Sequence, residues 1–220
     1  MRCAPEQRRH YTDLATTYLG NDVCLYEIRR IPDSLAFERV FIGVCISKIW
    51  ATNRSDGDAL KFTDDTSVAE SHPAIQRQIE SGQFSQALPA IDQALDQNPD
   101  SVKLWRTKGV ALGYLEGHAE ALACFERATE LSPRFLSAWY HRGVACSILE
   151  RYEDAVLAYE EAHRLNSSDA STSFNLGCFL AHLGRLKEAK SSLIAAEEAG
   201  HPRARDILSD IQRAIAEEEA

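Results

Sequence analysis

Histidine and cysteine are the side chains of this sequence whose types could do chemistry, because both can hold a zinc ion. Seven of them alternate along the second half of the chain: His118, Cys124, His141, Cys146, His163, Cys178 and His182. Zinc ligands lie closer in sequence, typically as two cysteines separated by two to four residues and two histidines by three to five. No two cysteines and no two histidines of this chain keep that spacing. We therefore predict no metal site and no cofactor.

The motifs that mark common active sites are missing from the sequence as well. It contains no glycine-rich phosphate loop, no HExxH and no GxSxG. The adjacent acids Glu160-Glu161 and Glu197-Glu198 are interpreted as solvated faces of helices. We therefore expect a protein that is not an enzyme. The alternative, that the chain is an accessory part of an enzyme, has no motif in its favour.

The six cysteines are scattered along the chain, at Cys3, Cys24, Cys45, Cys124, Cys146 and Cys178, without a CxxC pair. Cysteine is among the residues most often buried as a small apolar side chain. The pattern predicts reduced, mostly buried thiols and a cytoplasmic location, because a reducing compartment keeps thiols from pairing.

Charge and hydropathy limit the possible partners. The formal net charge is −9, and nearly all of the acidic excess lies after residue 65, so the chain lacks the basic surplus that binds nucleic acid. The most apolar run, residues 40–46, is far shorter than the roughly 18 residues needed to span a bilayer. We expect a protein or peptide partner, and neither nucleic acid nor membrane.

The elements that position these side chains show a fixed period. Residues of one type recur 34 positions apart in four columns: Gly109, Gly143 and Gly177; Ala121, Ala155 and Ala189; Ala128, Ala162 and Ala196; and the pair Trp105 and Trp139. Such a period, with these residue types, is typical of stacked helix-turn-helix units.

One unit carries the pattern W-x2-L-G-x2-Y, then A-x3-F, A and P, at Trp105, Lys108, Gly109, Leu112, Ala121, Phe125, Ala128 and Pro133, with Lys108 departing from leucine. The sequence thereby resembles the tetratricopeptide repeat family. The resemblance implies an all-α, right-handed solenoid of stacked antiparallel helix pairs. It covers residues 68–200 as four units, 68–101, 102–135, 136–169 and 170–200, of which the first is degenerate. A capping helix is expected over 201–220, with Ile207, Leu208, Ile211 and Ile215 in one stripe.

The repeated columns are interpreted as packing positions. The glycines let the first helix of a unit approach the second closely, and Trp105, Phe125, Trp139 and Tyr159 are expected to fill the space between layers. Pro89 falls inside the expected helix 84–97, so that helix is predicted to be kinked or to start later.

The first 67 residues form a small appendage, 1–51, and a polar linker, 52–67. A helix is expected over 6–19. Residues 37–49 satisfy helical spacing, so a helix is favoured there too, although their β-branched side chains make a strand the competing interpretation. The appendage is expected either to cover the first repeat or to dock another chain through 40–50.

The resemblance also implies a concave binding groove lined by the first helix of each unit. Transferred position by position, its lining is Lys103, Arg106, Thr107, Val110, Ser137, Tyr140, His141, Val144, Ser171, Phe174, Asn175 and Cys178. Arg106, Tyr140 and Phe174 share one column and would form an aromatic and cationic ridge suited to a peptide. The family's clamp of lysine, asparagine and arginine for a terminal carboxylate has no match here, although Lys103, Arg106 and His141 could attract an acidic segment.

We therefore predict a non-enzymatic scaffold that binds a partner's peptide or helix in this groove. The alternative is a self-associating structural protein, such as a homodimer, that pairs through the N-terminal segment or the terminal helix.

Overall fold

The computed structural model describes residues 72–219, and all of them belong to one compact unit of the chain. The predicted appendage and linker, and the beginning of the first predicted repeat, lie outside the described residues. Within the described residues every regular element is a helix, as predicted. The helices are α5 (Pro73–Glu80), α6 (Phe84–Gln97), α7 (Val102–Tyr114), α8 (His118–Leu131), α9 (Leu136–Ile148), α10 (Tyr152–Leu165), α11 (Ala170–His182), α12 (Leu186–Glu198) and α13 (Ala204–Glu218).

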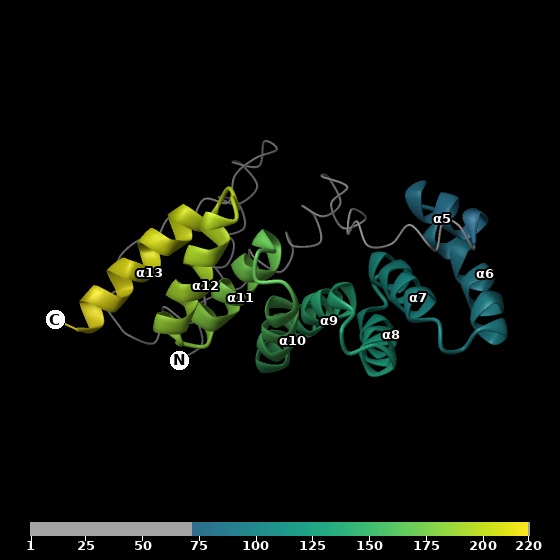
Figure 1. Cartoon of the computed structure of the whole chain (residues 1–220). Helices are drawn as coiled ribbons and strands as arrows, with labels where there is room; N and C mark the ends of the chain where they lie inside the picture. The colour runs from purple at the N-terminus through teal and green to yellow at the C-terminus, as the bar shows by residue number, and fades with distance from the viewer. Residues whose placement is uncertain (1–71, 220) are drawn as a thin grey trace, which may run out of the picture. The chain divides into compact units, whose positions relative to one another are not determined.

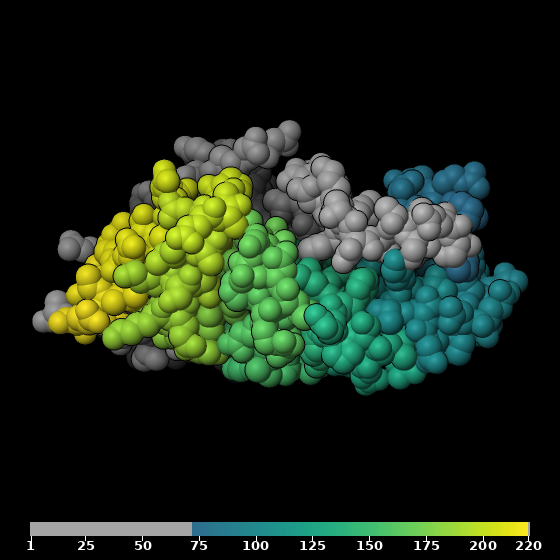
Figure 2. Space-filling model, in the orientation of Figure 1, coloured from purple at the N-terminus to yellow at the C-terminus, as the bar shows by residue number. Residues whose placement is uncertain are grey.

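Consecutive helices pack in pairs, and each pair packs on the next (Figure 1). The tightest pairs are α7 with α8, α9 with α10 and α11 with α12, while α8 with α9 and α10 with α11 join successive pairs. The coloured surface passes from blue through teal and green to yellow in chain order (Figure 2). These packed pairs confirm the predicted all-α solenoid. Among the described helices, none is long and apolar enough to cross a membrane.

The glycine column allows the close approach within each pair, as predicted. A methyl group at Gly109 would lie 2.5 Å from the ring of Phe125, and one at Gly143 would lie 2.8 Å from the ring of Tyr159. Real side chains do not approach so closely, so the second helix's aromatic residue fills the space that the missing methyl leaves.

The two tryptophans are only half-buried, in contrast to Phe125 and Tyr159, which are at most 1% exposed. Each indole Nε1 donates a hydrogen bond across the turn between units: Trp105 to the Pro99 carbonyl at 2.7 Å, and Trp139 to the Pro133 carbonyl at 2.9 Å. Each tryptophan therefore also stabilises the turn that precedes its first helix. An indole can do so because the N–H group on the edge of its ring is a hydrogen-bond donor.

Lys108, the departure from the leucine column, has a partner in the preceding unit. Its Nζ lies 2.7 Å from the Asp92 carboxylate and 5.5 Å from the centre of the Trp105 ring. One period later, Arg142 lies 3.9 Å from Glu126 and 5.2 Å from the Trp139 ring centre. A cation at this position thus joins the second helix of one unit to the first helix of the next. The apolar contact of a leucine is replaced by an ion pair and a cation–π contact.

A further column of the repeat concerns backbone conformation. Four of the five left-handed residues in the described part of the chain lie 34 residues apart: Gly82 (φ 71°), Glu116 (φ 65°), Glu150 (φ 59°) and Gly184 (φ 74°). They end the turn between the two helices of each unit. This column could not be recognised in the sequence, because two of its four members are glutamates. A glutamate adopts the left-handed conformation at a cost in free energy that glycine does not have.

Pro89 does not delay its helix. Helix α6 runs from Phe84 to Gln97 with Pro89 inside it, so the predicted later start is wrong. Packing explains the tolerance: Ala87, Ile91, Ala94 and Leu95 of the same helix are buried in the core that α6 shares with α5 and α7. The free energy of that burial offsets the hydrogen bond that proline cannot donate.

Helix α13 closes the described part of the chain. It begins at Ala204 and buries Ala204, Ile207, Leu208 and Ile211 against α12 and α11, whereas Ile215, the last member of the predicted stripe, is only partly buried. The apolar stripe therefore packs over its first three members.

The three described cysteines are buried free thiols, as predicted. Burial raises the pKa of Cys124 and of Cys146 to about 11. The described residues contain no cluster of three or more metal-ligating side chains.

Candidate peptide-binding surface

The twelve predicted groove residues lie on three first helices, four each on α7, α9 and α11. We call them the first-helix surface. Ten of them are less than 9% exposed, while Lys103 is half-buried and Ser171 is exposed. Most of the side chains in the predicted lining are therefore buried in the structure.

Adjacent first helices are joined through two neighbouring columns of this surface. Asn175 Nδ2 of α11 donates a hydrogen bond to the Tyr140 hydroxyl of α9 at 3.4 Å. Arg106 of α7 and His141 of α9 stand in the same relation one unit earlier. Burial, and after it the charge of Arg106, lowers the pKa of His141 to about 3. The imidazole is therefore neutral across the physiological range. Burial also lowers the pKa of Arg106 to about 10, so the guanidinium stays charged.

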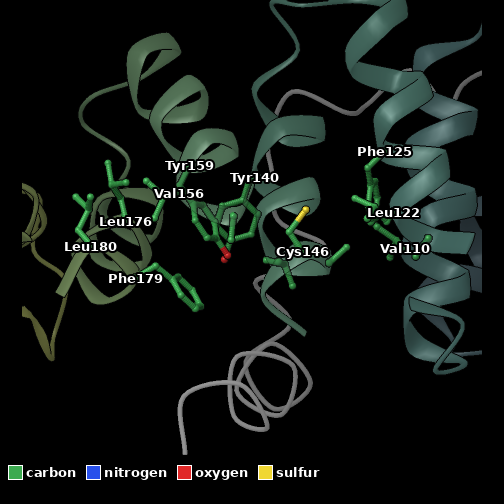
Figure 3. Close-up of a cluster of buried hydrophobic side chains, with 14 of the residues drawn as sticks. Val110, Leu122, Phe125, Tyr140, Cys146, Val156, Tyr159, Leu176, Phe179 and Leu180 are labelled. Atoms are coloured by element: carbon green, nitrogen blue, oxygen red, sulfur yellow. The ribbon is translucent and has the colours of Figure 1, made fainter. Parts of the chain in front are cut away.

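The same residues reach the aromatic core beneath them. The Tyr140 ring meets the Tyr159 ring edge-on with centres 5.9 Å apart, and His141 stacks on Phe125 at 5.3 Å. Figure 3 shows Tyr140 and Tyr159 close together within this cluster. Tyr140 is thus a core residue as well as a member of the first-helix surface. Truncating its side chain would destabilise the fold, so a loss of binding in such a variant would not identify a contact with the partner.

Phe174, the third member of the predicted ridge, is covered by the segment before α13. The His201 ring stacks on it with centres 3.8 Å apart, and the Arg203 guanidinium carbon lies 5.0 Å from its centre. Arg106, Tyr140 and Phe174 therefore do not form one open ridge. Sequence reasoning missed His201 and Arg203, because they lie outside the repeat columns and only the tertiary fold brings them to α11.

Two of the hydroxyls on the surface differ in their hydrogen bonding. Thr107 Oγ1 donates to the Lys103 carbonyl of its own helix at 2.8 Å. Ser137 Oγ is buried and has no hydrogen-bond partner within the described residues. A buried hydroxyl without a partner costs free energy, and Ser137 lies one helical turn before His141.

In the second, third and fourth units, charge is divided between the two helices, whereas α5, the first helix of the first unit, carries Glu80. Helices α7, α9 and α11 contain no aspartate or glutamate, whereas α6, α8, α10, α12 and α13 all contain several. The first helices carry Lys103, Arg106, Lys108 and Arg142, and the last two pair with second-helix acids. Among the described helices, the three that carry the first-helix surface are therefore the three without a carboxylate.

Sequence comparison places these helix pairs in a known family. The tetratricopeptide repeat profile matches residues 74–112, 106–170 and 149–205, which together span well over half of the chain. The chain belongs to the tetratricopeptide repeat family. Among curated proteins, none matches the sequence.

Solved structures of other tetratricopeptide repeat proteins share the fold. MamA from Desulfovibrio magneticus RS-1 is 17% identical, with a TM-score of 0.61 over 70% of this chain and 86% of that one. YrrB, described as a protein "with an unusual peptide-binding site", is 22% identical, with a TM-score of 0.59 over 72% and 85%. The first repeat domain of Spaghetti (RPAP3), solved with a bound HSP90 peptide, is 22% identical, with a TM-score of 0.50 over 52% and 93%. Likeness at this level of identity establishes the common fold.

Proposed function

We propose that this protein is a non-enzymatic scaffold that holds a peptide or helix of a partner protein against the first-helix surface. Family membership supports an interaction role, and the similar folds of YrrB and of Spaghetti have peptide-binding sites. Which side of this chain binds the partner is inferred from the chain's own residues.

The observation that carries the proposal is a row of buried polar side chains on consecutive first helices. Arg106, Ser137, His141 and Asn175 are each at most 8% exposed. Burying polar groups costs free energy, and apolar residues of similar size would serve packing better. A polar row retained at the cost of stability is expected where a fold recognises a ligand, because hydrogen bonds and charge give specificity that apolar contacts do not.

The test uses the two members of the surface that can be changed without disturbing the core. The double variant Lys103→Glu and Ser171→Arg alters side chains that are half-buried and exposed, on α7 and α11. The matched control makes the same two changes on the second helix α12, Lys187→Glu and Ser191→Arg, where both side chains are exposed.

Full-length protein and both double variants are used as bait in cross-linking capture, and the captured proteins are quantified by mass spectrometry. The proposal predicts that a set of proteins captured by the wild type is lost with the first-helix variant and kept with the α12 control. Equal capture by the two variants would refute it.

A further inference from the structure

We propose that the solenoid has a hinge between its third and fourth units, where α11 packs on α10. The fourth unit and α13 move together about aromatic contacts at one end of this junction, while the polar end of the junction opens. The movement changes the separation of α9 and α11, the first helices on either side of it. The hinge does not depend on what the first-helix surface binds.

Three junctions join the four units: α6 with α7, α8 with α9, and α10 with α11. At the first two, Trp105 and Trp139 donate a hydrogen bond to the proline carbonyl of the preceding turn. In α11 the same column holds Ser173, and Ser167 stands in the column of the two prolines. Serine has no indole, so the bond that ties α7 and α9 to their preceding turns is missing at α11.

The ion pair between units is also missing at the third junction. Lys108 of α7 and Arg142 of α9 each lie against an acid of the preceding second helix. The same column of α11 holds Leu176, which cannot form an ion pair. Glu160 of α10, the acid of this column, instead lies 3.3 Å from Arg185 in the turn before α12. These two side chains are 39% and 40% exposed, so their pairing stabilises the junction little.

Polar side chains stand at this end of the third junction. Ser173 Oγ lies 3.0 Å from Nδ1 of His163 in α10. Thr172, the neighbour of Ser173, is 0% exposed, and its hydroxyl has no hydrogen-bond partner within the described residues. When this end opens, water replaces the bond between Ser173 and His163 and supplies a partner for Thr172. Opening therefore costs less free energy here than at a junction that holds an indole and an ion pair.

The other end of the third junction is aromatic and closely packed. Phe179 of α11 stacks on Tyr159 and Tyr152 of α10, with ring centres 5.9 and 6.0 Å apart. Figure 3 shows Tyr159 and Phe179 in one cluster. Phe179 follows Ser173 by six residues, which is about 9 Å along a helix, so the two ends of the junction are separate. A packed end beside a water-replaceable end is the arrangement that a hinge requires.

The first helices agree with this position of the hinge. The backbones of α7 and α9 approach each other closely, and so do those of α11 and α13, whereas α9 and α11 have little direct backbone contact. The hydrogen bond from Asn175 to Tyr140, which joins α9 to α11, is long at 3.4 Å. Among α7, α9, α11 and α13, the step across the third junction is therefore the least closely packed.

The experiment measures distances between two spin labels in the full-length protein by pulsed electron paramagnetic resonance. One exposed column near the C-terminal ends of the second helices supplies matched sites: Asp96, Glu130, Arg164 and Glu198. The labels are carried by a genetically encoded amino acid, so that the native cysteines do not react. The N-terminal pair, at 96 and 164, spans the first and second junctions, and the C-terminal pair, at 130 and 198, spans the second and third. We expect a broader distance distribution for the C-terminal pair.

Two double variants test the cause of the difference. His163→Thr with Ser173→Trp copies the pair Thr129 and Trp139 found one unit earlier, and it should narrow the distribution of the C-terminal pair. Thr129→His with Trp139→Ser makes the reverse exchange and should broaden the distribution of the N-terminal pair. Ser191→Trp, which adds an indole at an exposed site of α12, is the control and should leave both distributions unchanged.

Equal widths for the two pairs in the otherwise wild-type protein would overturn the proposal. A broad C-terminal distribution that His163→Thr with Ser173→Trp leaves unchanged would overturn it as well. Circular dichroism establishes that each variant is folded. If that double variant does not fold, the comparison of the two pairs and the reverse exchange decide the question, because an N-terminal distribution that the reverse exchange leaves unchanged also contradicts the hinge.

Discussion

Replacing Gly177 with alanine places a methyl group where α11 touches α12. The new carbon would lie 2.7 Å from Leu193 Cγ, 3.0 Å from its Cδ2 and 3.2 Å from the Ala189 carbonyl oxygen. Leu193 and Ala189 are both 0% exposed, so neither has free space to move into. Relief of the contact therefore requires the two helices to separate.

The magnitude follows from two opposing terms. In an unobstructed helix, glycine to alanine stabilises by about 0.5–1 kcal/mol, because alanine loses less conformational freedom on folding. An extra methyl group in a well-packed core typically costs about 1–3 kcal/mol. We expect the steric cost to prevail, with a net loss of about 1–2 kcal/mol, because one of the obstructing atoms belongs to the backbone of α12.

The assay is urea-induced unfolding followed by circular dichroism, with wild type and variant compared at their midpoints. Hydrogen exchange of the α11 and α12 amides adds a local measure, since repeat proteins can unfold in parts. Gly117→Ala is the matched control. Gly117 is the N-cap of α8, and a methyl group there meets no atom closer than 3.4 Å, so the change should cost at most about 1 kcal/mol, because alanine is a poorer N-cap than glycine.

A second variant tests the reason as well as the size. In a Leu193→Ala background the obstruction is largely removed, so adding Gly177→Ala should there be close to neutral or stabilising. A Gly177→Ala protein as stable as wild type, or an equal loss in both backgrounds, would refute the packing account of the glycine column.

Four further predictions concern single residues. Tyr140→Phe keeps the core ring and removes the hydroxyl that accepts from Asn175, so it should cost at most about 1 kcal/mol, whereas Tyr140→Ala should cost about 3–5 kcal/mol in the same unfolding assay. Because burial and Arg106 lower the pKa of His141 to about 3, its neutral form contributes stability that is fully present above the unfolded pKa of about 6.5 and lost as pH falls toward 3. His141→Gln should therefore flatten the pH dependence of the unfolding midpoint over that window; an unchanged slope would contradict the assignment. Glu150→Gly should stabilise by about 1 kcal/mol, since φ is 59° there, and a loss of stability would show that the side chain matters more than the backbone. Burial raises the pKa of the Cys146 thiol to about 11, so an aromatic disulfide reagent should modify it only on the timescale of unfolding, and rapid modification of the native protein would contradict its placement.

Residue types that recur at a fixed step carried most of the fold prediction. The glycine and alanine columns have to be small wherever two helices touch, so the requirement appears in every unit and can be counted in the sequence. Repeat positions that accept residues of different types were missed, because no single residue type recurs there at the fixed step. Glu116 and Glu150 take a conformation that Gly82 and Gly184 take elsewhere in the chain, and Lys108 replaces an apolar contact with an ion pair.

The repeat register was enough to place the candidate surface on three helices, but it could not predict whether the side chains of that surface are accessible. Whether a side chain in a given column is accessible depends on neighbours that are distant in sequence, such as Tyr159 beneath Tyr140 and His201 above Phe174. The sequence shows that the segments of α7, α9 and α11 contain no acidic residues. Only the structure shows that these three helices lie on the same side of their helix pairs.

The amino-acid sequence by itself determined the repeat, its helices and its packing columns, because these depend on local periodicity and on residue size. Tertiary structure decided which polar groups are buried, which cations already face a carboxylate and which ring is covered by a segment outside the repeat. Burial and charge pairing depend on which atoms lie nearby in space, and helices separated by a whole repeat become neighbours only when the chain is folded.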